Sequence, residues 1–433
     1  MGNLFKTSNS NQFGKAEQYI CGLFQAKRSN IERMSEVVVD SDYYQIQHFI
    51  SESPWDARGI MNEVARQSSE LFSEFEDVYL LIDESAHTKK GDKSVGVARQ
   101  YSGQLGKVDN CQMAVYAALS AGKYYSLIDA RLFLPEQWTS DKKRCKQAGV
   151  PEDNIRFKTK LELALEMITH QKQKGTRFNW VGGDGFYGHD IKFRTAVASM
   201  GLNYMLDIHS TDGVYLQEPQ ISIPEKKSKR GRKPVLPRAG TPRIKVSDIA
   251  ENTPQQHWKT YTVRDTAKGP LVIGALIKEV FTWDEKAITC NKEILVIRRS
   301  KNEKGNYEYK YSLSNADINK YSWLQLSQAQ AQRFFVERSF EDAKQEVGMS
   351  QYQVRGWRAW HHHIALVMLS MLFILTEKLE YKNEYPLLSA SDVREIIART
   401  YAQQDNIIGI IKLRHKRRQD DIDRRYKIKS PDK

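Results

Sequence analysis

Three carboxylates and two cations stand where they could build a site that handles a phosphodiester. Asp83 and Asp184 each follow an apolar run, at the point where a strand would end. A carboxylate there is partly removed from water, which is costly unless the group is paired or binds a metal. Glu337 lies between Arg333 and Lys344 on a later amphipathic stretch. A single acid flanked by two bases suits a metal-bound phosphodiester.

The later stretch, Gln330 to Met349, is expected to form one amphipathic helix. At about 100° per residue, Arg333, Glu337 and Lys344 fall in a narrow sector of that helix. The neighbouring sector is apolar and can pack against a core. Its members are Val336, Phe340, Ala343 and Val347. The alternative is a surface helix with intrahelical pairs such as Arg333 with Glu337, and Asp83 or Asp184, taken singly, could merely cap a turn.

Length and composition restrict the class of protein. A chain of 433 residues suggests two to four modules. The longest apolar run, residues 364–375, is shorter than the roughly 20 residues of a membrane span, so we expect a buried helix and no membrane. The N-terminal residues are polar, and the four cysteines stand apart without a Cys-x-x-Cys pair. We therefore expect a reducing cytoplasm, no disulfides and no zinc site.

The net charge of +13 comes from two segments. Residues 226–238, named the basic segment below, hold seven cations and no acid, and residues 412–433 carry a net +6. Such blocks indicate contact with a polyanion, and the alternative is a solvated linker and tail. The central cations of the basic segment are Lys229, Arg230, Arg232 and Lys233.

The chain up to about Phe75 is expected to be helical. Apolar spacing and a Ser-Pro-Trp-Asp sequence, with Ser as a cap and Pro at the first helical position, indicate several short helices. These helices suit a helix-turn-helix-like DNA reader, and a plain helical bundle fits equally. The cations on them are Lys27, Arg28, Arg33 and Arg58.

From Val78 onward the pattern is that of a sheet. Four apolar runs read as strands, beginning with VYLLIDES and ending with YYSLIDARLFLP. A helix over Leu161 to Lys174, a strand ending at Asp184, a helix over Asp190 to Met200 and a strand LNYMLDIH follow. This order predicts an α/β fold with a mixed sheet, in which functional groups gather where strands end.

The remaining residues divide the chain further. Residues 217–325 begin Pro-rich and basic and continue with antiparallel β patterns, so we expect a β-rich insertion with a basic linker. The expected organisation is a helical N-terminal DNA-binding region, a first part of a catalytic core, the insertion, the last part of the core and a helical basic C-terminal region. Their bounds are 1–75, 76–216, 217–325, 326–380 and 381–433.

Three motifs, LLIDES, VGGDGFYG and RFFVERSFEDAK, together resemble the DDE transposases of bacterial insertion sequences. In one branch of that family the last motif is Tyr, two residues, Arg, three residues, Glu, six residues and Lys. Arg333, Glu337 and Lys344 keep this spacing, and Gln330 stands where Tyr is expected. A β-rich insertion before the Glu is also typical of this branch. The resemblance runs from about Tyr19 to about Leu375.

The resemblance implies an RNase H-like core and two-metal-ion catalysis. Asp83 and Asp184 would hold two Mg²⁺ ions, for which Mn²⁺ can substitute, and Glu337 would complete one of them. Arg333 and Lys344 would contact the DNA backbone without reading its sequence. Water and then a DNA 3′ hydroxyl would act at the same site, so no covalent protein intermediate is needed.

The implied partners are double-stranded DNA, both the terminal inverted repeats of an element and its target, and a second protomer in the DNA complex. A non-catalytic repressor derived from a transposase and an RNase H-like nuclease that does not join strands are the alternatives. Trp258 and Trp283 could stack on an unpaired base or belong to the core. The histidines at 361–363 are structural or face DNA, because Mg²⁺ disfavours imidazole.

Overall fold

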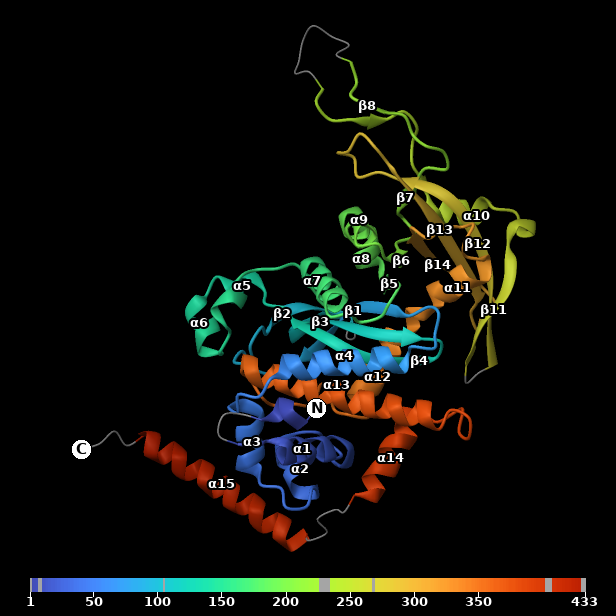
Figure 1. Cartoon of the computed structure of the whole chain (residues 1–433). Coiled ribbons are helices and arrows are strands. Elements are labelled where there is room, and N and C mark those ends of the chain that lie inside the picture. Colours follow the sequence, from blue (N-terminus) through green and yellow to red (C-terminus); the bar gives the residue numbers. More distant parts are fainter. Residues whose placement is uncertain are drawn as a thin grey trace. The chain divides into compact units, whose positions relative to one another are not determined.

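The computed structural model describes residues 2–6, 10–103, 106–225, 234–266, 269–401 and 407–429. The chain forms two compact units (Figure 1). The first unit consists of Met1–Ile60 and Asp342–Lys433, and the second of Met61–Glu341. Helices α4 (Ala57–Leu71) and α12 (Phe334–Gln345) run across the two boundaries.

The second unit is built on one mixed sheet. Ten strands of the described residues join in the order β11-β12-β13-β14-β6-β5-β1-β3-β2, with β4 also paired to β3. β1, β5 and β6 are parallel to one another, and every other pairing in this sheet is antiparallel. The bounds are β1 Tyr79–Thr88, β2 Ala98–Ser102, β3 Lys107–Ala121, β4 Tyr124–Leu132, β5 Trp180–Gly183, β6 Asn203–Ile208, β11 Lys259–Thr266, β12 Gly269–Thr282, β13 Asn291–Lys301 and β14 Tyr307–Ser314.

The mixed α/β sheet with flanking helices that the sequence predicts is confirmed. Each apolar run before residue 210 forms a strand, and β3, whose second half is fully buried, lies near the middle of the core. The antiparallel strands from 259 to 314 are present, but they continue the central sheet through the pairing of β14 with β6. Figure 1 shows this second half of the sheet running at a steep angle to β1–β3. The expected domain boundaries stay predictions.

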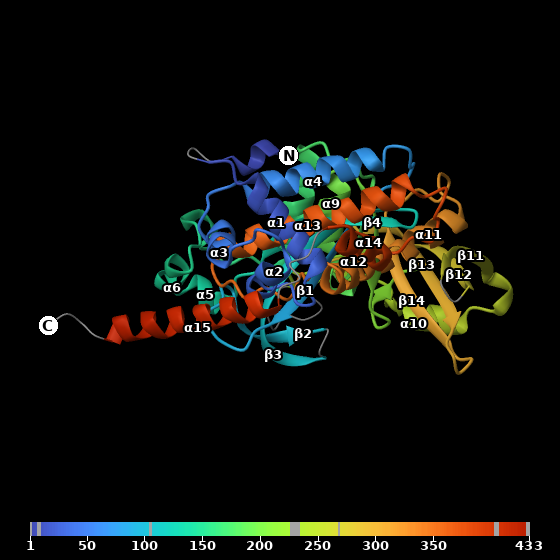
Figure 2. The same ribbon diagram turned by 90° about the horizontal axis from the view of Figure 1, so that it is seen from below.

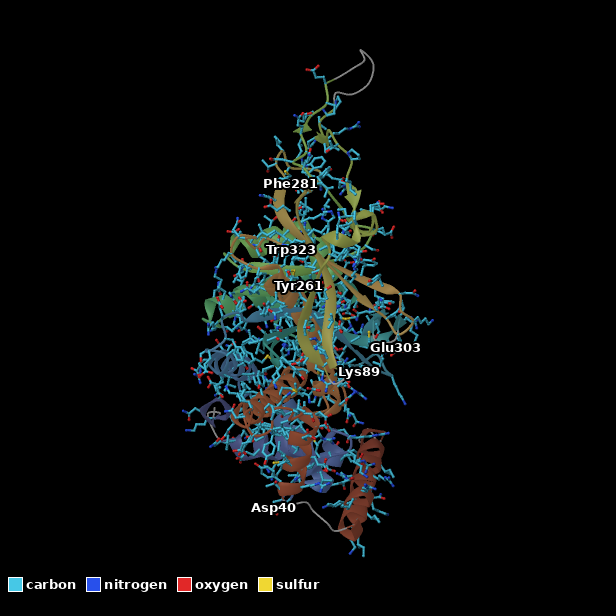
Figure 3. All side chains as sticks on the ribbon, turned by 90° about the vertical axis from the view of Figure 1, so that its right-hand side faces the viewer. Asp40, Lys89, Tyr261, Phe281, Glu303 and Trp323 are labelled. Atoms are coloured by element: carbon cyan, nitrogen blue, oxygen red, sulfur yellow. The ribbon has the colours of Figure 1, made fainter. Side chains whose placement is uncertain are left out.

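The flanking helices of the second unit begin at residues that satisfy free backbone N–H groups. Thr159 caps α7 (Lys160–Gln173) and Ser322 caps α11 (Trp323–Gln332), each in a reciprocal capping box. Asp190 caps α9 (Ile191–Ser199), close to the predicted start. α7 packs against β3 and β4, α9 against β6, and α11 against β6 and β11–β13. α11 and β11 can be located in Figure 3 by Trp323 and Tyr261.

Shorter elements complete the second unit. They are α5 Glu136–Thr139, α6 Lys142–Gln147, α8 Gly185–His189, α10 Val246–Asn252, and the two-residue strands β7 Gly213–Val214, β8 Ile221–Ser222, β9 Arg238–Ala239 and β10 Ile244–Lys245. The central part of the basic segment, residues 226–233, lies outside the described residues. The predicted phosphate contacts of Lys229, Arg230, Arg232 and Lys233 therefore stay predictions.

The first unit is helical. It contains α1 Phe13–Gln25, α2 Ile31–Val37, α3 Tyr43–Ser51, α13 Trp357–Glu380, α14 Ala390–Thr400 and α15 Ile407–Lys429. The helices of the N-terminal residues are thus present, and α1 packs against α13 and α14. α13 carries the apolar run of 364–375 and is long and apolar enough to cross a membrane, yet 78% of its most apolar window is buried. We assign it as a core helix, as the sequence predicts.

Buried histidines tie α13 to the N-terminal helices. His362 lies 3.0 Å from the Ile50 carbonyl oxygen and stacks on the Trp55 ring at 3.7 Å between centroids. His363 lies 2.8 Å from the Tyr19 hydroxyl. Burial lowers the pKa of His362 to about 4, so its ring is neutral at physiological pH. His362 and His363 are therefore structural residues, which is one of the two roles that the sequence left open.

The C-terminal basic helix binds an acid within the same unit. Arg414 and Arg417 of α15 donate hydrogen bonds to the buried carboxylate of Glu36 on α2, at 2.8 and 3.1 Å. Figure 2 shows the ribbon of α15 passing close to α2. Burial raises the pKa of Glu36, but the hydrogen bonds from Arg414 and Arg33 outweigh it and hold the pKa below its usual range. Part of the positive charge after residue 412 is therefore neutralised inside the protein.

Candidate active site

Three aspartates, named the aspartate row below, follow the parallel-paired stretches of β1, β5 and β6. Asp83 itself lies in the middle of β1, which continues to Thr88 in its pairing with β3, so the prediction that Asp83 ends a strand was wrong. The register pairs Ile82 of β1 with Gly183 of β5, and Gly183 with Leu206 of β6. The next residue on each chain is Asp83, Asp184 or Asp207. The structure thus brings the predicted pair Asp83 and Asp184 together. It also adds Asp207, which sequence reasoning missed, although Asp207 follows an apolar run just as the other two do.

Asp184 is held by the turn that leads into α8. Its Oδ1 accepts a hydrogen bond from the Phe186 backbone N–H at 3.0 Å, so the capping alternative describes part of its role. α8 lies close against β6, because a Cβ on Gly188 would be 1.8 Å from the Asp207 carbonyl oxygen. Glycine is therefore required at 188, and the VGGDGFYG motif fixes where Asp184 sits.

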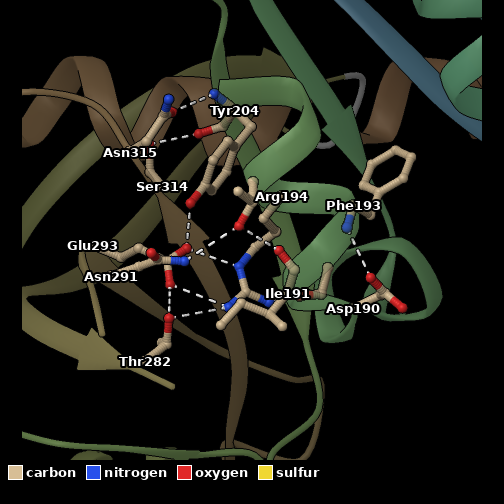
Figure 4. Close-up of polar contacts among 12 residues, drawn as sticks. Asp190, Ile191, Phe193, Arg194, Tyr204, Thr282, Asn291, Glu293, Ser314 and Asn315 are labelled. Atoms are coloured by element: carbon tan, nitrogen blue, oxygen red, sulfur yellow. Dashed lines mark hydrogen bonds and ion pairs between the residues drawn. The ribbon is translucent and has the colours of Figure 1, made fainter. Parts of the chain in front are cut away.

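A buried ion pair fastens β6 to the strands beside it. Arg194 of α9 donates hydrogen bonds to both carboxylate oxygens of Glu293 on β13, at 2.8 and 3.1 Å (Figure 4). Tyr204 of β6 and Thr282 of β12 also donate to Glu293. The side chains of Arg194 and Glu293 are 4% and 1% exposed. This network connects α9, β6, β12 and β13, and so supports the strand that carries Asp207.

Burial and mutual repulsion make Asp83 and Asp184 difficult to ionise. Burial and the Asp184 charge raise the pKa of Asp83, Arg333 opposes them, and the resulting pKa is about 7. Burial also raises the pKa of Asp184, and the neighbouring Glu84 charge adds to the rise. A cation between the two carboxylates would remove this penalty. Their oxygen-only donor set is the kind that Mg²⁺ prefers.

Arg333 links three of the acids. Its Nε lies 2.8 Å from Asp207 Oδ2, and its Nη1 lies 2.7 Å from Glu337 Oε1 and 3.9 Å from Asp83 Oδ2. Burial lowers the pKa of Arg333, but the charges of Asp207, Glu337 and Asp83 outweigh it and raise the pKa above its ordinary value. Arg333 therefore pairs with Asp207, Glu337 and Asp83 at the same time in this structure.

Glu337 is connected to the aspartates by its ion pair with Arg333. Its side chain is 52% exposed, and it pairs with Arg333 four residues earlier, as the surface-helix alternative expects, although Arg333 lies just outside α12. The described residues contain no group of three or more His, Cys, Asp or Glu close enough to hold a metal ion. Because Glu337 and Asp83 share Arg333 Nη1, their oxygens cannot lie farther apart than the 2.7 and 3.9 Å distances combined.

The helix that carries Glu337 differs from its prediction. The stretch from 330 to 349 forms the end of α11 and then α12, with Arg333 as the C-terminal cap of α11 between them. The prediction of a single helix was therefore wrong. The apolar residues are all buried as expected, namely Val336, Phe340, Ala343 and Val347. Lys344 lies near the end of α12 within the other compact unit, and its role stays a prediction.

Glu84 is a second acid that sequence reasoning did not single out, despite its place beside Asp83. Its Oε1 lies 2.7 Å from Lys160 Nζ, and its Oε2 accepts a hydrogen bond from the Tyr187 hydroxyl at 3.2 Å. Both oxygens are thus occupied by protein groups. Glu84 acts on the site through its charge.

The two tryptophans proposed for base stacking have different surroundings. Trp258 is 7% exposed and belongs to the apolar cluster under β12–β14, with the Arg299 guanidinium 4.0 Å from its ring. This is the core alternative, and stacking on a base does not fit that burial. Trp283 is half-buried, and its Nε1 donates to the Ala287 carbonyl oxygen at 2.8 Å. Base stacking by Trp283 stays a prediction.

Asp83 and Asp184 are thus partly buried acids on two neighbouring parallel strands, and Arg333 links Glu337 to Asp83 and Asp207. The sequence model of the DDE superfamily endonucleases matches residues 3–270, and the chain belongs to this family. The match includes Asp83 and Asp184 and ends before Glu337.

A relative encoded by an insertion sequence indicates which kind of DDE endonuclease this chain resembles. Over 189 residues, 42% of this chain, the protein is 30% identical to the "Probable transposase for insertion sequence element IS701" of Microchaete diplosiphon. The chain spans 45% of that relative's length. The resemblance to the DDE transposases of insertion sequences is therefore confirmed. A cryo-EM structure of the piggyBac transposase synaptic complex with hairpin DNA aligns with 93% of this chain and 73% of its own, at 10% identity and a TM-score of 0.39, which is too low to support an argument.

Proposed function

We propose that this chain is a DNA transposase that binds the ends of an insertion sequence, cleaves phosphodiester bonds there by two-metal-ion catalysis, and joins the 3′ ends to target DNA. One observation carries the proposal. Asp83 and Asp184 are adjacent, partly buried and reluctant to ionise, and Arg333 lies near both Asp83 and Glu337. Strained pairs of this kind are characteristic of catalytic sites.

The residues present fit two Mg²⁺ ions, with Mn²⁺ as a substitute. Asp83 and Asp184 would hold them, and Glu337 would complete one ion after leaving Arg333. Ions bound there activate the attacking oxygen and neutralise charge on the phosphate. The contribution of the chain is to orient these carboxylates and to exclude water around them. Arg333 and Lys344 then hold backbone phosphates, which positions the strand without reading its bases.

The parallel strands β1, β5 and β6, with antiparallel β3 beside β1, support an RNase H-like core. The basic segment supports contact with double-stranded DNA at element ends and at the target. We infer further that two protomers act together, one on each end, and that the protein works at the bacterial nucleoid. Trp283 remains the candidate for stacking on an unpaired base.

Cleavage of a duplex that bears the element's end tests the proposal, in Mg²⁺ or Mn²⁺. Asp83→Asn, Asp184→Asn and Glu337→Gln should each reduce strand cleavage at least a hundredfold, because each removes charge that the reaction needs. DNA binding in EDTA should persist. Glu341→Gln is the matched control, since Glu341 lies one turn along α12 and pairs at the surface with Arg338. It should cleave as the wild type does.

The outcomes separate the alternatives. Cleavage by Glu337→Gln at the wild-type rate would remove that residue from the site. Cleavage without joining of a precut 3′ end to plasmid DNA would indicate a nuclease. Binding without cleavage by the wild-type protein would indicate a repressor.

A further inference from the structure

Two arginines of the central sheet have no acidic partner. Arg264 of β11 and Arg298 of β13 form no hydrogen bond or ion pair with any residue that the structure describes. Arg264 Nε is buried without an acceptor. Other enclosed arginines of the same unit are paired, Arg194 with Glu293 and Arg333 with Asp207. A desolvated guanidinium without a partner costs free energy, so these two positions need an explanation.

Arg298 lies on the same face of the sheet as Asp207. The register pairs Asp207 with Ser312 of β14, and Ser312 with Val296 of β13. Directly paired residues point to the same face, and so do residues two apart on one strand. Arg298, two residues beyond Val296, is therefore on the Asp207 face. β13 is two strand spacings from β6, which is roughly 10 Å.

The segment that carries Arg333 covers this face. Gln330 donates through Nε2 to Ser312 Oγ at 2.8 Å and to the Val296 carbonyl oxygen at 3.2 Å. The Arg264 guanidinium lies 3.7 Å from the ring centroid of Phe334, the residue after Arg333. Arg264 thus reaches the same segment from the edge strand β11, which lies in front in Figure 3.

Electrostatics agree with this placement. Burial lowers the pKa of Arg298, the Asp207 charge opposes this, and the Arg264 and Arg333 charges lower the pKa further. Burial also lowers the pKa of Arg264. Three guanidiniums therefore act on one another beside the aspartate row, and just one of them, Arg333, is neutralised by carboxylates.

We propose that Arg298 and Arg264 bind a DNA phosphate close to the one that is cleaved, on the β13 side of the aspartates. The assignment rests on the proposed function, which brings a polyanion to Asp83 and Asp184. A planar guanidinium matches phosphate oxygens with two parallel hydrogen bonds. The cost of the unpaired cations in the free protein is then recovered when DNA binds. An acidic segment of a partner protein is the competing ligand.

The experiment compares Arg298→Met with Arg299→Met in the full chain. Arg299 is the matched control because it is adjacent, is 8% exposed, bonds to Gln255 and stacks on Trp258. Arg298→Met should leave the melting temperature of the free protein unchanged or raise it, since an unpaired buried charge is removed. Arg299→Met should lower the melting temperature, since a satisfied charge is lost.

DNA binding gives the second readout. With a duplex of the element's end in EDTA, each lost phosphate contact reduces the slope of log K against log salt by about 0.9. Arg298→Met should show that reduction, so that raising the salt from 50 to 200 mM weakens its binding about threefold less than that of the wild type. The Arg264→Met and Arg298→Met double variant should show roughly twice the reduction. Arg299→Met should keep the wild-type slope.

Other results would overturn the assignment. A lower melting temperature with an unchanged salt slope for Arg298→Met would show a purely structural arginine. Inorganic pyrophosphate should raise the melting temperature of the wild type more than that of Arg298→Met. If polyglutamate does so and pyrophosphate does not, the ligand is an acidic protein segment. Failure here, with cleavage still abolished in Asp83→Asn and Asp184→Asn, leaves the proposed function intact, whereas cleavage by these two variants at the wild-type rate refutes that function whatever the slopes are.

Discussion

The pKa of Asp83 predicts how the stability of the second unit depends on pH. In the folded protein this pKa is about 7, against an ordinary value of 3.8. The folded protein therefore keeps a proton that the unfolded chain releases between these values. Stability must fall as the pH rises through that window, because the folded state binds more protons. Asp184, whose pKa is also raised, contributes in the same direction.

The size of the effect follows from the shift. Between pH 5 and pH 8 the unfolded carboxyl stays ionised, while the folded one loses its proton at about pH 7. The two pH units below the folded pKa correspond to roughly 3 kcal/mol of lost stability in metal-free protein. Asp83→Asn, which is nearly isosteric, should remove most of this loss. It also takes away one charge that repels Asp184.

Amide hydrogen exchange of β1 and β5 in EDTA measures this stability within the second unit alone. Protection of these amides should fall from pH 5 to pH 8 in the wild type, after correction for the intrinsic exchange rate, and should change little in Asp83→Asn. Mg²⁺ at pH 8 should restore protection in the wild type and not in the variant. Asp109→Asn is the control, because backbone and Lys107 hydrogen bonds lower the pKa of this exposed acid and it titrates below the window.

Parallel pH profiles for the wild type and Asp83→Asn would refute the reasoning. They would mean that Asp83 ionises normally in the folded protein. The aspartate row would then carry no electrostatic penalty for a cation to remove. The proposed metal site would lose its main physical support, even if the fold is as described.

Three further predictions concern other parts of the chain. Arg194→Met should lower the free energy of unfolding in urea by about 3–5 kcal/mol, because it leaves Glu293 buried without its ion-pair partner. Arg243→Met, at an exposed pair, should lower it by under about 0.5 kcal/mol. Equal losses for the two variants would contradict this. Neutralising the four central cations of the basic segment should reduce the salt slope of binding by roughly 3–4 for terminal and random duplex alike, and an unchanged slope would indicate a linker. Lys27→Gln with Arg28→Gln, exposed between α1 and α2, should weaken discrimination between terminal and random DNA, and retained discrimination would place recognition elsewhere.

The sequence predicted the strands well, because the apolar pattern of a strand is carried by neighbouring residues. Each apolar run before residue 210 forms a strand, since its side chains are buried by neighbours on both faces of the sheet. The same patterns placed Asp184 correctly at a strand end, whereas Asp83 lies in the middle of β1. Their meeting depends on the parallel pairing of β1 with β5, which the motif resemblance implied and periodicity alone did not.

Features that depend on pairing between distant segments were missed. Asp207 stands in no motif, and it joins the row only through the register of β5 with β6. The break lies at Arg333, whose side chain pairs with Asp207 and Glu337. A helical periodicity of 100° per residue carries no information about the contact with the distant Asp207. Arg298 and Arg299 look alike in the sequence, yet strand alternation sends one to an unpartnered face and the other to Gln255 and Trp258.

Arg333 places a constraint on any route to catalysis at this site. Its Nη1 donates to Glu337 Oε1 at 2.7 Å, so this pairing holds that oxygen of Glu337 away from any metal ion. For its Oε1 to serve as a metal ligand, Glu337 would have to give up this pairing, while Asp207 can keep Arg333 in place through Nε at 2.8 Å. Asp207 is thus suited to position Arg333 in both states. In the proposed function, Glu337 turns toward Asp83 as the DNA phosphate takes its place on Arg333, which couples assembly of the site to the presence of substrate.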